Sequence, residues 1–349
     1  MNSENGEKAL NEIQNNKPIK KKLAYTILTF GWIVILFAII GSICFGATDV
    51  NFDTTWRSFL FYDSTNPQHV IIHNLRLPRA LAAAFVGAGL AVSGAIMQGM
   101  TRNPLASPSI LGVSAGALFF IALAFAIFQN ISYGNLILIS FLGAGVSAFL
   151  VFSIVALSKG GNISVKLALA GSAITSLLSA LSTAISLKFD IAKDMSYWYA
   201  GGIAGIQFDQ LKYVIPVIII GLLCALFISH SITILSLGED VAKGLGQNTK
   251  FVRFVGIITV LLLTGAAVSI SGIIGFVGLI VPHITRFTVG LDYRLIIPCS
   301  AILGALLLLG ADMIAKIINA PFETPVGAVT AIVGIPFFLY LARKEGGAI

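Results

Sequence analysis

Two histidines in a polar segment have the residue type and the spacing that could bind a metal ion. His69 and His73 are one helical turn apart, so a helix would present both rings on one face. No carboxylate or cysteine lies close by in the sequence, and a pair of surface histidines is the more frequent explanation of such a spacing. The sequence therefore predicts no metal site and no bound cofactor.

A second candidate for chemistry is a pair of arginines, Arg76 and Arg79, which flank Pro78. A guanidinium suits bidentate recognition of a carboxylate, although arginines at a membrane surface also serve as snorkelling anchors. Far along the chain, Asp312 is the main acid inside an apolar run, and Lys316 follows one turn later, where the two can pair. The scarcity of such acids counts against an ion-coupled secondary transporter.

Hydroxyl side chains recur at i, i+3, i+4 and i+7 spacing in one apolar run, which places them on one face of a helix. They are Ser172, Thr175, Ser176, Ser179, Thr183 and Ser186. Such a face could line a wet path for a polar solute. Hydroxyls that bond to neighbouring helices produce the same pattern, so the sequence leaves both explanations open.

A glycine-bounded segment has the features of a short amphipathic helix. Its defining residues are Gly238, Glu239, Asp240, Val241, Ala242, Leu245 and Gly246. The two acids favour the positive end of a helix, and the last glycine suits a left-handed stop. Val241 and Leu245 are one turn apart, which leaves the charges on the other side. We expect this helix to dock against another protein from a cytoplasmic loop at about 230–250.

Patterns typical of enzymes are missing from the sequence. It has no G-x-x-x-x-G-K-[ST] motif to cradle the phosphates of ATP. Cys44, Cys224 and Cys299 stand far apart in apolar runs, without metal or disulfide spacing. A membrane enzyme would need His, Asp or Glu clustered at one membrane face, and the sequence offers no such cluster. We therefore predict a protein that is not an enzyme.

The elements that must position these residues are membrane-spanning helices. The chain of 349 residues is 57% hydrophobic and only 11% charged, with a mean hydropathy of +0.94, whereas a soluble domain carries roughly 25% charged residues. The net charge of +7 is scattered between apolar runs, so it does not indicate binding to nucleic acid. The composition predicts an all-α, polytopic protein of the cell membrane, in contact with the lipid bilayer.

Ten apolar runs come close to the roughly 20 residues that a span needs. They lie at about 23–46, 80–100, 110–128, 136–157, 167–187, 211–229, 251–272, 274–290, 295–315 and 326–342. The eighth contains Gly275, Gly278 and Pro282, so we expect it to be short or broken. A cytoplasmic tail, 1–22, then precedes a single transmembrane domain, 23–349.

The positions of lysine and arginine predict how the chain crosses the membrane. An even number of spans with both termini in the cytoplasm places most of the basic residues on the cytoplasmic side. In this topology a faint internal repeat is inverted, as repeats in many transporters are. Gly87-Ala88, Ser93-Gly94, Ile96 and Pro104 recur at one constant offset as Gly265-Ala266, Ser271-Gly272, Ile274 and Pro282.

Several long motifs stand in order along the chain. The first is RLPRALAAAFVGAGLAVSGAIMQGMTRNPLASPSILGVSAGA at 76–117. The others are SGIIGFVGLIVPHITR at 271–286, GADMIAK at 310–316 and ETPVGAVTAIVGIPFF at 323–338. These motifs resemble those of FecCD-type permeases, the membrane subunits of ABC importers for iron-siderophores, haem and vitamin B12. The similarity runs in order from the second span to the C-terminus. It implies ten spans in the fold of the vitamin B12 permease.

The resemblance also implies partners and roles. The partners are a second permease subunit, two cytoplasmic ATP-binding subunits and an extracytoplasmic substrate-binding protein. Arg76, Arg79 and Lys316 would face acids on the binding protein, with Lys316 where the family pattern has arginine. The helix around 239–246 would seat in the ATPase, and the hydroxyl face would line the path. The segment MSYWYAGGIAG at 195–205 looks most like siderophore permeases, so the expected cargo is iron(III)-siderophore, with haem or vitamin B12 as alternatives.

Overall fold

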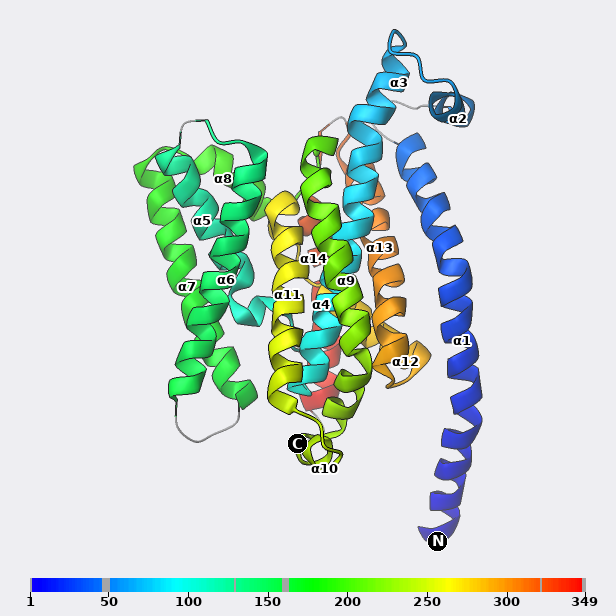
Figure 1. Ribbon diagram of the computed structural model, residues 1–349. Coiled ribbons are helices and arrows are strands. Elements are labelled where there is room, and N and C mark those ends of the chain that lie inside the picture. The colour runs from blue at the N-terminus through cyan, green and yellow to red at the C-terminus, as the bar shows by residue number, and fades with distance from the viewer. Residues whose placement is uncertain (1, 46–50, 129, 159–162, 321, 347–349) are drawn as a thin grey trace.

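The computed structural model describes residues 2–45, 51–128, 130–158, 163–320 and 322–346, and every regular element in these ranges is a helix (Figure 1). The long helices are α1 (Asn2–Cys44), α4 (Leu77–Thr101), α6 (Tyr133–Leu157), α7 (Ile163–Lys188), α9 (Phe208–Leu237), α11 (Thr249–Ser271), α13 (Tyr293–Ile318) and α14 (Val326–Gly346). The shorter ones are α2 (Phe52–Leu60), α3 (Pro67–Ile71), η1 (Ile72–Arg76), η2 (Pro108–Leu111), α5 (Val113–Ile127), α8 (Ala192–Ala200), α10 (Glu239–Gly244) and α12 (Val277–Val289).

The helices reproduce the predicted series of spans. Within the described residues, seven helical segments are long and apolar enough to cross a membrane, and three shorter apolar helices, Val113–Ile127, Val277–Val289 and Val326–Leu341, complete the series. The predicted boundary between a tail at 1–22 and the first span is not a break in structure, because α1 runs as one helix from Asn2. Met1 and residues 46 and 347–349 of these predictions lie outside the described residues.

The core is built around α4, which is buried along nearly its whole length. It packs against α13, α11, α9 and α12. Glycines allow the closest approaches, because a Cβ at Gly87 would collide with the carbonyl oxygen of Gly304, and one at Gly94 with that of Gly278. Small residues let membrane helices pack backbone against backbone, so the high glycine content positions the central helices.

The eighth span is short, as predicted, and its break lies at Gly275. α11 ends at Ser271, non-helical residues follow, and α12 begins only at Val277; Gly278 and Pro282 lie within α12 and do not interrupt it. The repeated segments do run in opposite directions, but their local structures differ. Ser93 and Gly94 lie within α4, whereas Ser271 ends α11 and Gly272 leaves it at φ +64°.

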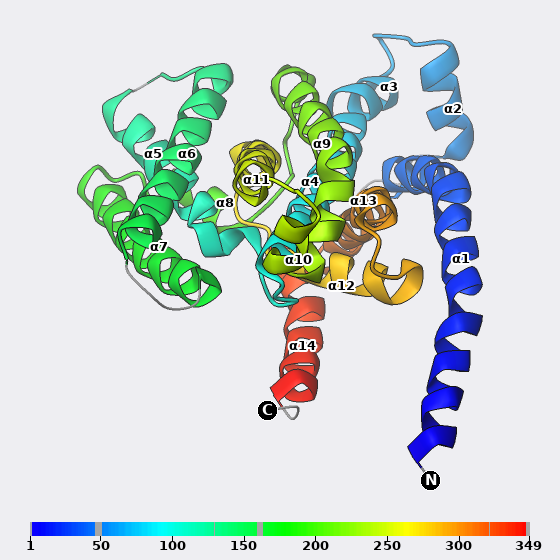
Figure 2. The same ribbon diagram turned by 60° about the horizontal axis from the view of Figure 1, so that its bottom comes forward.

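The molecule has two distinct ends, which we call upper and lower after their positions in Figure 1. α2, α3 and α8 lie at the upper end, whereas α10 and both chain ends lie at the lower end. In both Figure 1 and Figure 2, α1 forms one flank of the molecule and α7 the opposite flank. α10, which lies in the loop at about 230–250, is therefore at the end opposite α2, α3 and α8.

Candidate functional site

A cluster of charged side chains lies at the upper end, between α4, α13 and the start of α14. Arg79 Nε is 2.8 Å from Asp312 Oδ1, and Arg79 Nη1 is 2.6 Å from Glu323 Oε1. Lys316 Nζ is 2.8 Å from Asp312 Oδ2. The predicted pairing of Asp312 with Lys316 is thus present, and the close packing of α4 on α13 brings Arg79 to the same carboxylate.

The end of α1 closes one side of this cluster. Arg76 donates from Nη1 to the carbonyl oxygens of Ile43 at 2.6 Å and Cys44 at 3.1 Å. Lys316 donates from Nζ to Ser42, to its carbonyl oxygen at 3.1 Å and its Oγ at 3.0 Å. These bonds explain how two cations are accommodated where water is scarce, because each has protein oxygen partners.

The three cations are shielded from solvent. Arg76, Arg79 and Lys316, which the family resemblance places opposite acids of a binding protein, are all buried in the structure. Their partners include backbone carbonyls and Asp312, which pure surface anchors would not need. The most accessible member of the cluster is a carboxylate.

That accessible member is Glu323, whose side chain is 49% exposed. Glu323 is the first residue of the ETPVG motif, but no local pattern marks it as a partner of Arg79. It lies in a loop that only the tertiary structure brings to Arg79. With three cations and two carboxylates, the cluster keeps an excess of positive charge beneath this glutamate.

The segment that follows Glu323 is attached to α8. The backbone N–H of Gly327 donates to the carbonyl oxygen of Gly201 at 2.8 Å, and that of Ile273 donates to Trp198 at 3.0 Å. Gly201 has φ +68°, and a Cβ there would collide with the carbonyl oxygen of Ile273. Three chain segments therefore meet at the C-terminal end of α8, and only glycine fits at their junction.

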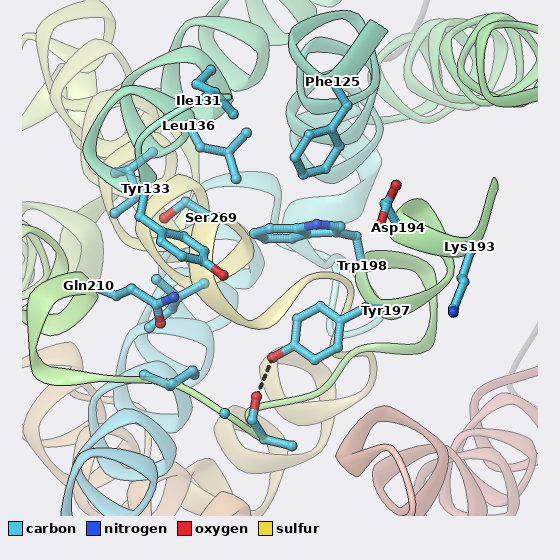
Figure 3. A pocket seen from close by; sticks show the side chains of 15 residues that line it. Phe125, Ile131, Tyr133, Leu136, Lys193, Asp194, Tyr197, Trp198, Gln210 and Ser269 are labelled. Carbon is cyan, nitrogen blue, oxygen red and sulfur yellow. Dashed lines mark hydrogen bonds between the residues drawn. The ribbon is translucent and has the colours of Figure 1, made fainter. Parts of the chain in front are cut away.

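A cavity of about 560 Å³ opens at the upper end beside α8. Figure 3 shows Tyr133, Tyr197, Trp198 and Phe125 directed toward it, with Lys193 and Asp194 at its edge. Tyr197 donates its hydroxyl to the carbonyl oxygens of Ala204 at 2.9 Å and Gly202 at 3.0 Å. Burial of the phenol raises the pKa of Tyr197 to about 12, and the nearby Tyr133 adds to the rise.

The predicted hydroxyl face lies on α7, at the flank of the molecule. Ser172, Ser176 and Thr183 are exposed, Thr175 and Ser179 are half-buried, and Ser186 is buried. Ser172, Thr183 and Ser186 donate to carbonyl oxygens three or four residues back in α7 itself. A second hollow, of about 550 Å³, lies between α7 and α8 and is lined partly by Thr183 and Ser186. The stripe therefore leads up to α8.

The predicted short helix is present at the lower end as α10. Gly238 precedes it at φ +138°, and Gly246 follows at φ +77°. The N–H groups of Gly246 and Gln247 donate to the carbonyls of Lys243 and Ala242, at 2.9 Å in both cases. These two hydrogen bonds around a left-handed glycine form a Schellman motif. Gly246 therefore ends the helix in the left-handed conformation that the sequence predicts.

Charges and burial on α10 differ from face to face. Glu239 pairs with Lys243 at 2.9 Å and with Arg253 at 2.7 Å, which ties α10 to α11. The hydrogen bond from Lys243 holds the pKa of Glu239 below its ordinary value, and Arg253 acts in the same direction. Val241 and Leu245 are exposed, whereas Ala242 is completely buried. Val241 and Leu245 are thus the exposed apolar residues of α10 and its C-cap, beside the exposed charges of Asp240 and Lys243.

The two histidines have structural partners. His69 Nδ1 accepts from the backbone N–H of Asp63 at 3.1 Å, and His73 Nε2 lies 3.0 Å from the carbonyl oxygen of Ser58. His69 is buried, whereas sequence analysis treated it as a surface residue. Within the described part of the chain, no group of three or more His, Cys, Asp or Glu residues could hold a metal ion.

Comparison with known proteins assigns this architecture. The model of the FecCD transport family matches residues 34–344. The chain belongs to the FecCD transport family. This FecCD permease is similar to the iron(3+)-hydroxamate import system permease protein FhuB of Bacillus subtilis, with 52% identity over 96% of this chain and 90% of that protein.

The FecCD permease also resembles a permease named for another cargo and a solved transporter structure. It is 36% identical to the hemin transport system permease protein HmuU of Yersinia pestis, over 91% of this chain and 96% of that protein. A solved metal-chelate type ABC transporter in an inward-facing conformation matches with a TM-score of 0.79 and 30% identity, over 92% of this chain and 99% of that chain.

Family membership confirms the main expectations about class. The FecCD permease is an all-helical, multi-pass membrane subunit of an ABC importer. It is a transporter subunit and not an enzyme, because ATP hydrolysis in such importers is carried out by partner subunits. An ATPase and a substrate-binding protein are therefore implied as partners, as the sequence motifs predict.

Proposed function

We propose that this chain passes iron(III)-siderophore, of the hydroxamate class, from the upper to the lower end of the molecule. The observation that carries this proposal is the 52% identity with the hydroxamate permease over 96% of the chain. A haem permease is 36% identical, so haem is the less favoured cargo.

We propose that the lower end is cytoplasmic, with both termini on that side. The basic residues around α10, including Lys243, Lys250 and Arg253, support this orientation because positively charged loops stay in the cytoplasm. The upper end, with α8 and the charged cluster, then receives cargo from outside. Cargo would descend beside α7, between this chain and a second permease subunit that is either a copy or a paralogue.

In this proposal the binding protein docks through acidic residues onto Arg76, Arg79 and Lys316. Because these cations are buried, an incoming carboxylate competes with Glu323 for Arg79 Nη1 rather than meeting a free cation. Displacement of Glu323 would loosen the segment that leads to Gly327, which is hydrogen-bonded to the end of α8. Docking would thereby act on α8, the helix that lies over the cavity.

At the lower end, α10 would transmit the conformational change that ATP hydrolysis produces in the ATPase to the permease. Val241 and Leu245 offer an exposed apolar face of a rigid helix, and Glu239 fixes that helix to α11 through Arg253. Two ATP-binding subunits, one for each permease of the pair, complete the proposed importer.

Uptake in a deletion strain tests the cargo. Cells that lack this gene and carry it back on a plasmid are supplied with radioactive ferric hydroxamate, haem or cobalamin as separate sources. We expect restoration of ferric hydroxamate uptake alone. Restoration of haem or cobalamin uptake, with no effect on the ferric hydroxamate, would overturn the proposed cargo while leaving the family assignment intact.

A further inference from the structure

Helix α2 at the upper end has an unusual distribution of side chains. Its small polar residues, Thr55 and Ser58, are buried, whereas its large apolar residues are exposed. Phe52, Trp56, Phe59 and Leu60 are between 42% and 64% exposed. In water this arrangement would be unfavourable, because burial of large apolar side chains is the main favourable term in packing a helix.

The spacing of these residues places them on one continuous face. Positions 52, 56, 59 and 60 follow the i, i+4, i+7, i+8 pattern of a helical stripe. Asp53 and Arg57 lie beside this stripe, on a separate exposed face, and pair with each other at 2.8 Å. α2 therefore has one face toward the protein, one apolar exposed face and one charged exposed face.

The protein-facing side holds α2 at the level where the first span ends. Thr55 Oγ1 lies 3.5 Å from Cys44 Sγ at the end of α1, and the Ser58 carbonyl oxygen lies 3.0 Å from His73 Nε2. Figure 1 views α2 nearly along its axis while α1 runs up the page, so α2 lies across the direction of the spans. A helix in this position lies parallel to a membrane surface, not through the membrane.

We propose that α2 is an interfacial helix, with the stripe of Phe52, Trp56, Phe59 and Leu60 inserted at the boundary between headgroups and acyl chains of the outer leaflet. α1, which α2 contacts, also exposes large apolar side chains, among them Trp32, Leu36 and Phe37, as a helix in lipid would. Tryptophan and other aromatic residues favour this boundary, and an amphipathic helix with one apolar face binds there.

Two observations separate lipid from other occupants. In both Figure 1 and Figure 2, α2 lies on the flank opposite α7, away from the hydroxyl stripe and the permease partner proposed there. Asp53 and Arg57 are the charged residues of α2 and cancel, so apolar burial drives the insertion and anionic lipid is not needed. The inference does not depend on the cargo.

From this position, α2 would help to hold the charged cluster that contains Arg76. Arg76 ends η1, and its guanidinium bonds to the carbonyls of Ile43 and Cys44, next to the contact of Cys44 with Thr55. An α2 seated in the interface would hold the end of α1, and with it Arg76, at a constant depth relative to the membrane surface.

The three tryptophans of the chain provide the test. Single-tryptophan variants that keep Trp32, Trp56 or Trp198 are made by replacing the other two with phenylalanine, and each is placed in vesicles of brominated phosphatidylcholine. Bromine near the headgroups should quench Trp56 most, bromine deep in the chains should quench Trp32 most, and Trp198, which is buried, should respond to neither. Addition of phosphatidylglycerol should leave the Trp56 result unchanged.

A second measurement protects the test from variants that fail to fold. Nitroxide labels on Phe59→Cys and Arg57→Cys, in the full-length permease, should differ in accessibility. The label at 59 should favour oxygen, which concentrates in lipid, and the label at 57 should favour a water-soluble nickel chelate. Iodide quenching of Trp56 without any effect of brominated lipid, or equal nickel access at both labels, would overturn the proposal. A Trp56 shielded from both iodide and bromine would also overturn it, because a protein would then cover the stripe.

Discussion

Arg79 and Glu323 lie 244 positions apart in the sequence, yet Arg79 Nη1 and Glu323 Oε1 are 2.6 Å apart. The same guanidinium contacts Asp312 through Nε at 2.8 Å. One arginine therefore joins a buried acid on α13 to a half-exposed acid in the loop before α14. In the proposed docking, the half-exposed acid is the partner that a carboxylate of the binding protein would replace.

Replacing Glu323 by glutamine should strengthen docking of the binding protein. The substitution removes a competing carboxylate, and an ion pair with an exposed partner is worth about 0.2–1 kcal/mol, so we expect the Kd to be roughly 1.4- to five-fold lower. The measurement is binding of loaded binding protein to permease–ATPase complex in lipid nanodiscs, at low and high salt.

The control for Glu323→Gln is Asp209→Asn, which removes an exposed acid at the start of α9 that pairs with Lys212. This control should leave the Kd within error. The gain in binding affinity from Glu323→Gln should become smaller at high salt, because salt screens the charges. Weaker binding by Glu323→Gln at low salt would show that the glutamate holds the cluster in shape and does not compete.

Replacing both Val241 and Leu245 by glutamate should abolish uptake while the permease still inserts in the membrane. Both side chains are exposed, so the fold tolerates the change, but an apolar contact with the ATPase would be lost. Co-purification of the ATPase and uptake of ferric hydroxamate are the two measurements. Normal uptake by this variant would remove α10 from the coupling role.

Ala242 is a poor choice for the same experiment. It is completely buried, so a bulky charged residue there would disrupt the seat of α10 itself. We expect Ala242→Glu to lower the yield of folded permease, which separates a folding defect from a coupling defect.

Cysteines along α7 should report whether the hydroxyl stripe faces water. Ser176→Cys should react with a small charged thiol reagent, because Ser176 is exposed, whereas Leu178→Cys should be protected, because Leu178 is buried. Leu181 would be a misleading control, since it is itself exposed. Reaction rates are compared in the assembled importer. Protection of Ser176→Cys equal to that of Leu178→Cys would indicate that the stripe is a packing surface.

Gly201→Ala should damage the end of α8 more than Gly205→Ala does. Both glycines have positive φ, at +68° and +72°, so both substitutions bear a conformational cost of roughly 1 kcal/mol. Only at Gly201 would the new Cβ also collide with the Ile273 carbonyl, whereas nothing lies within 4 Å at Gly205. The midpoint temperature of thermal unfolding and the rate of uptake should both be lower for Gly201→Ala than for Gly205→Ala. Equal effects would mean that the close approach has no importance.

Protonation of Glu239 should release α10 only in acid. Lys243 and Arg253 lower the pKa of this carboxyl, so its stabilising contribution is complete above the ordinary value of 4.5 and is lost as pH falls through the lowered pKa. Hydrogen exchange of the amides in α10 should therefore be constant from pH 7 to about 5 and rise below that range, once corrected for intrinsic rates. The Glu239→Gln variant should show rapid exchange of these amides at every pH. If the exchange rates of the variant and the wild type differed by the same factor at every pH, the charge of Glu239 would have no role in holding α10.

The sequence by itself determined the class of the protein and its main elements. Long apolar runs with few charges cannot form a water-soluble surface, so the spans were predictable one by one. The break before the eighth span followed from Gly275, and the stop of α10 followed from Gly246, because the conformational freedom of glycine acts locally, whereas Pro282 is accommodated within α12. The family was readable from long motifs that keep their order.

Tertiary structure alone decided which charges meet and which are exposed. Arg79, Asp312 and Glu323 come from three distant segments, and their contact depends on the packing of α4 against α13, which no local pattern encodes. Burial of Arg76 and Lys316 likewise depends on the end of α1. The burial of Ala242 and the exposure of the apolar face of α2 were also decided only by the tertiary structure. A periodic stripe in the sequence shows that a helix has an apolar face, but it does not show whether protein, water or lipid covers that face.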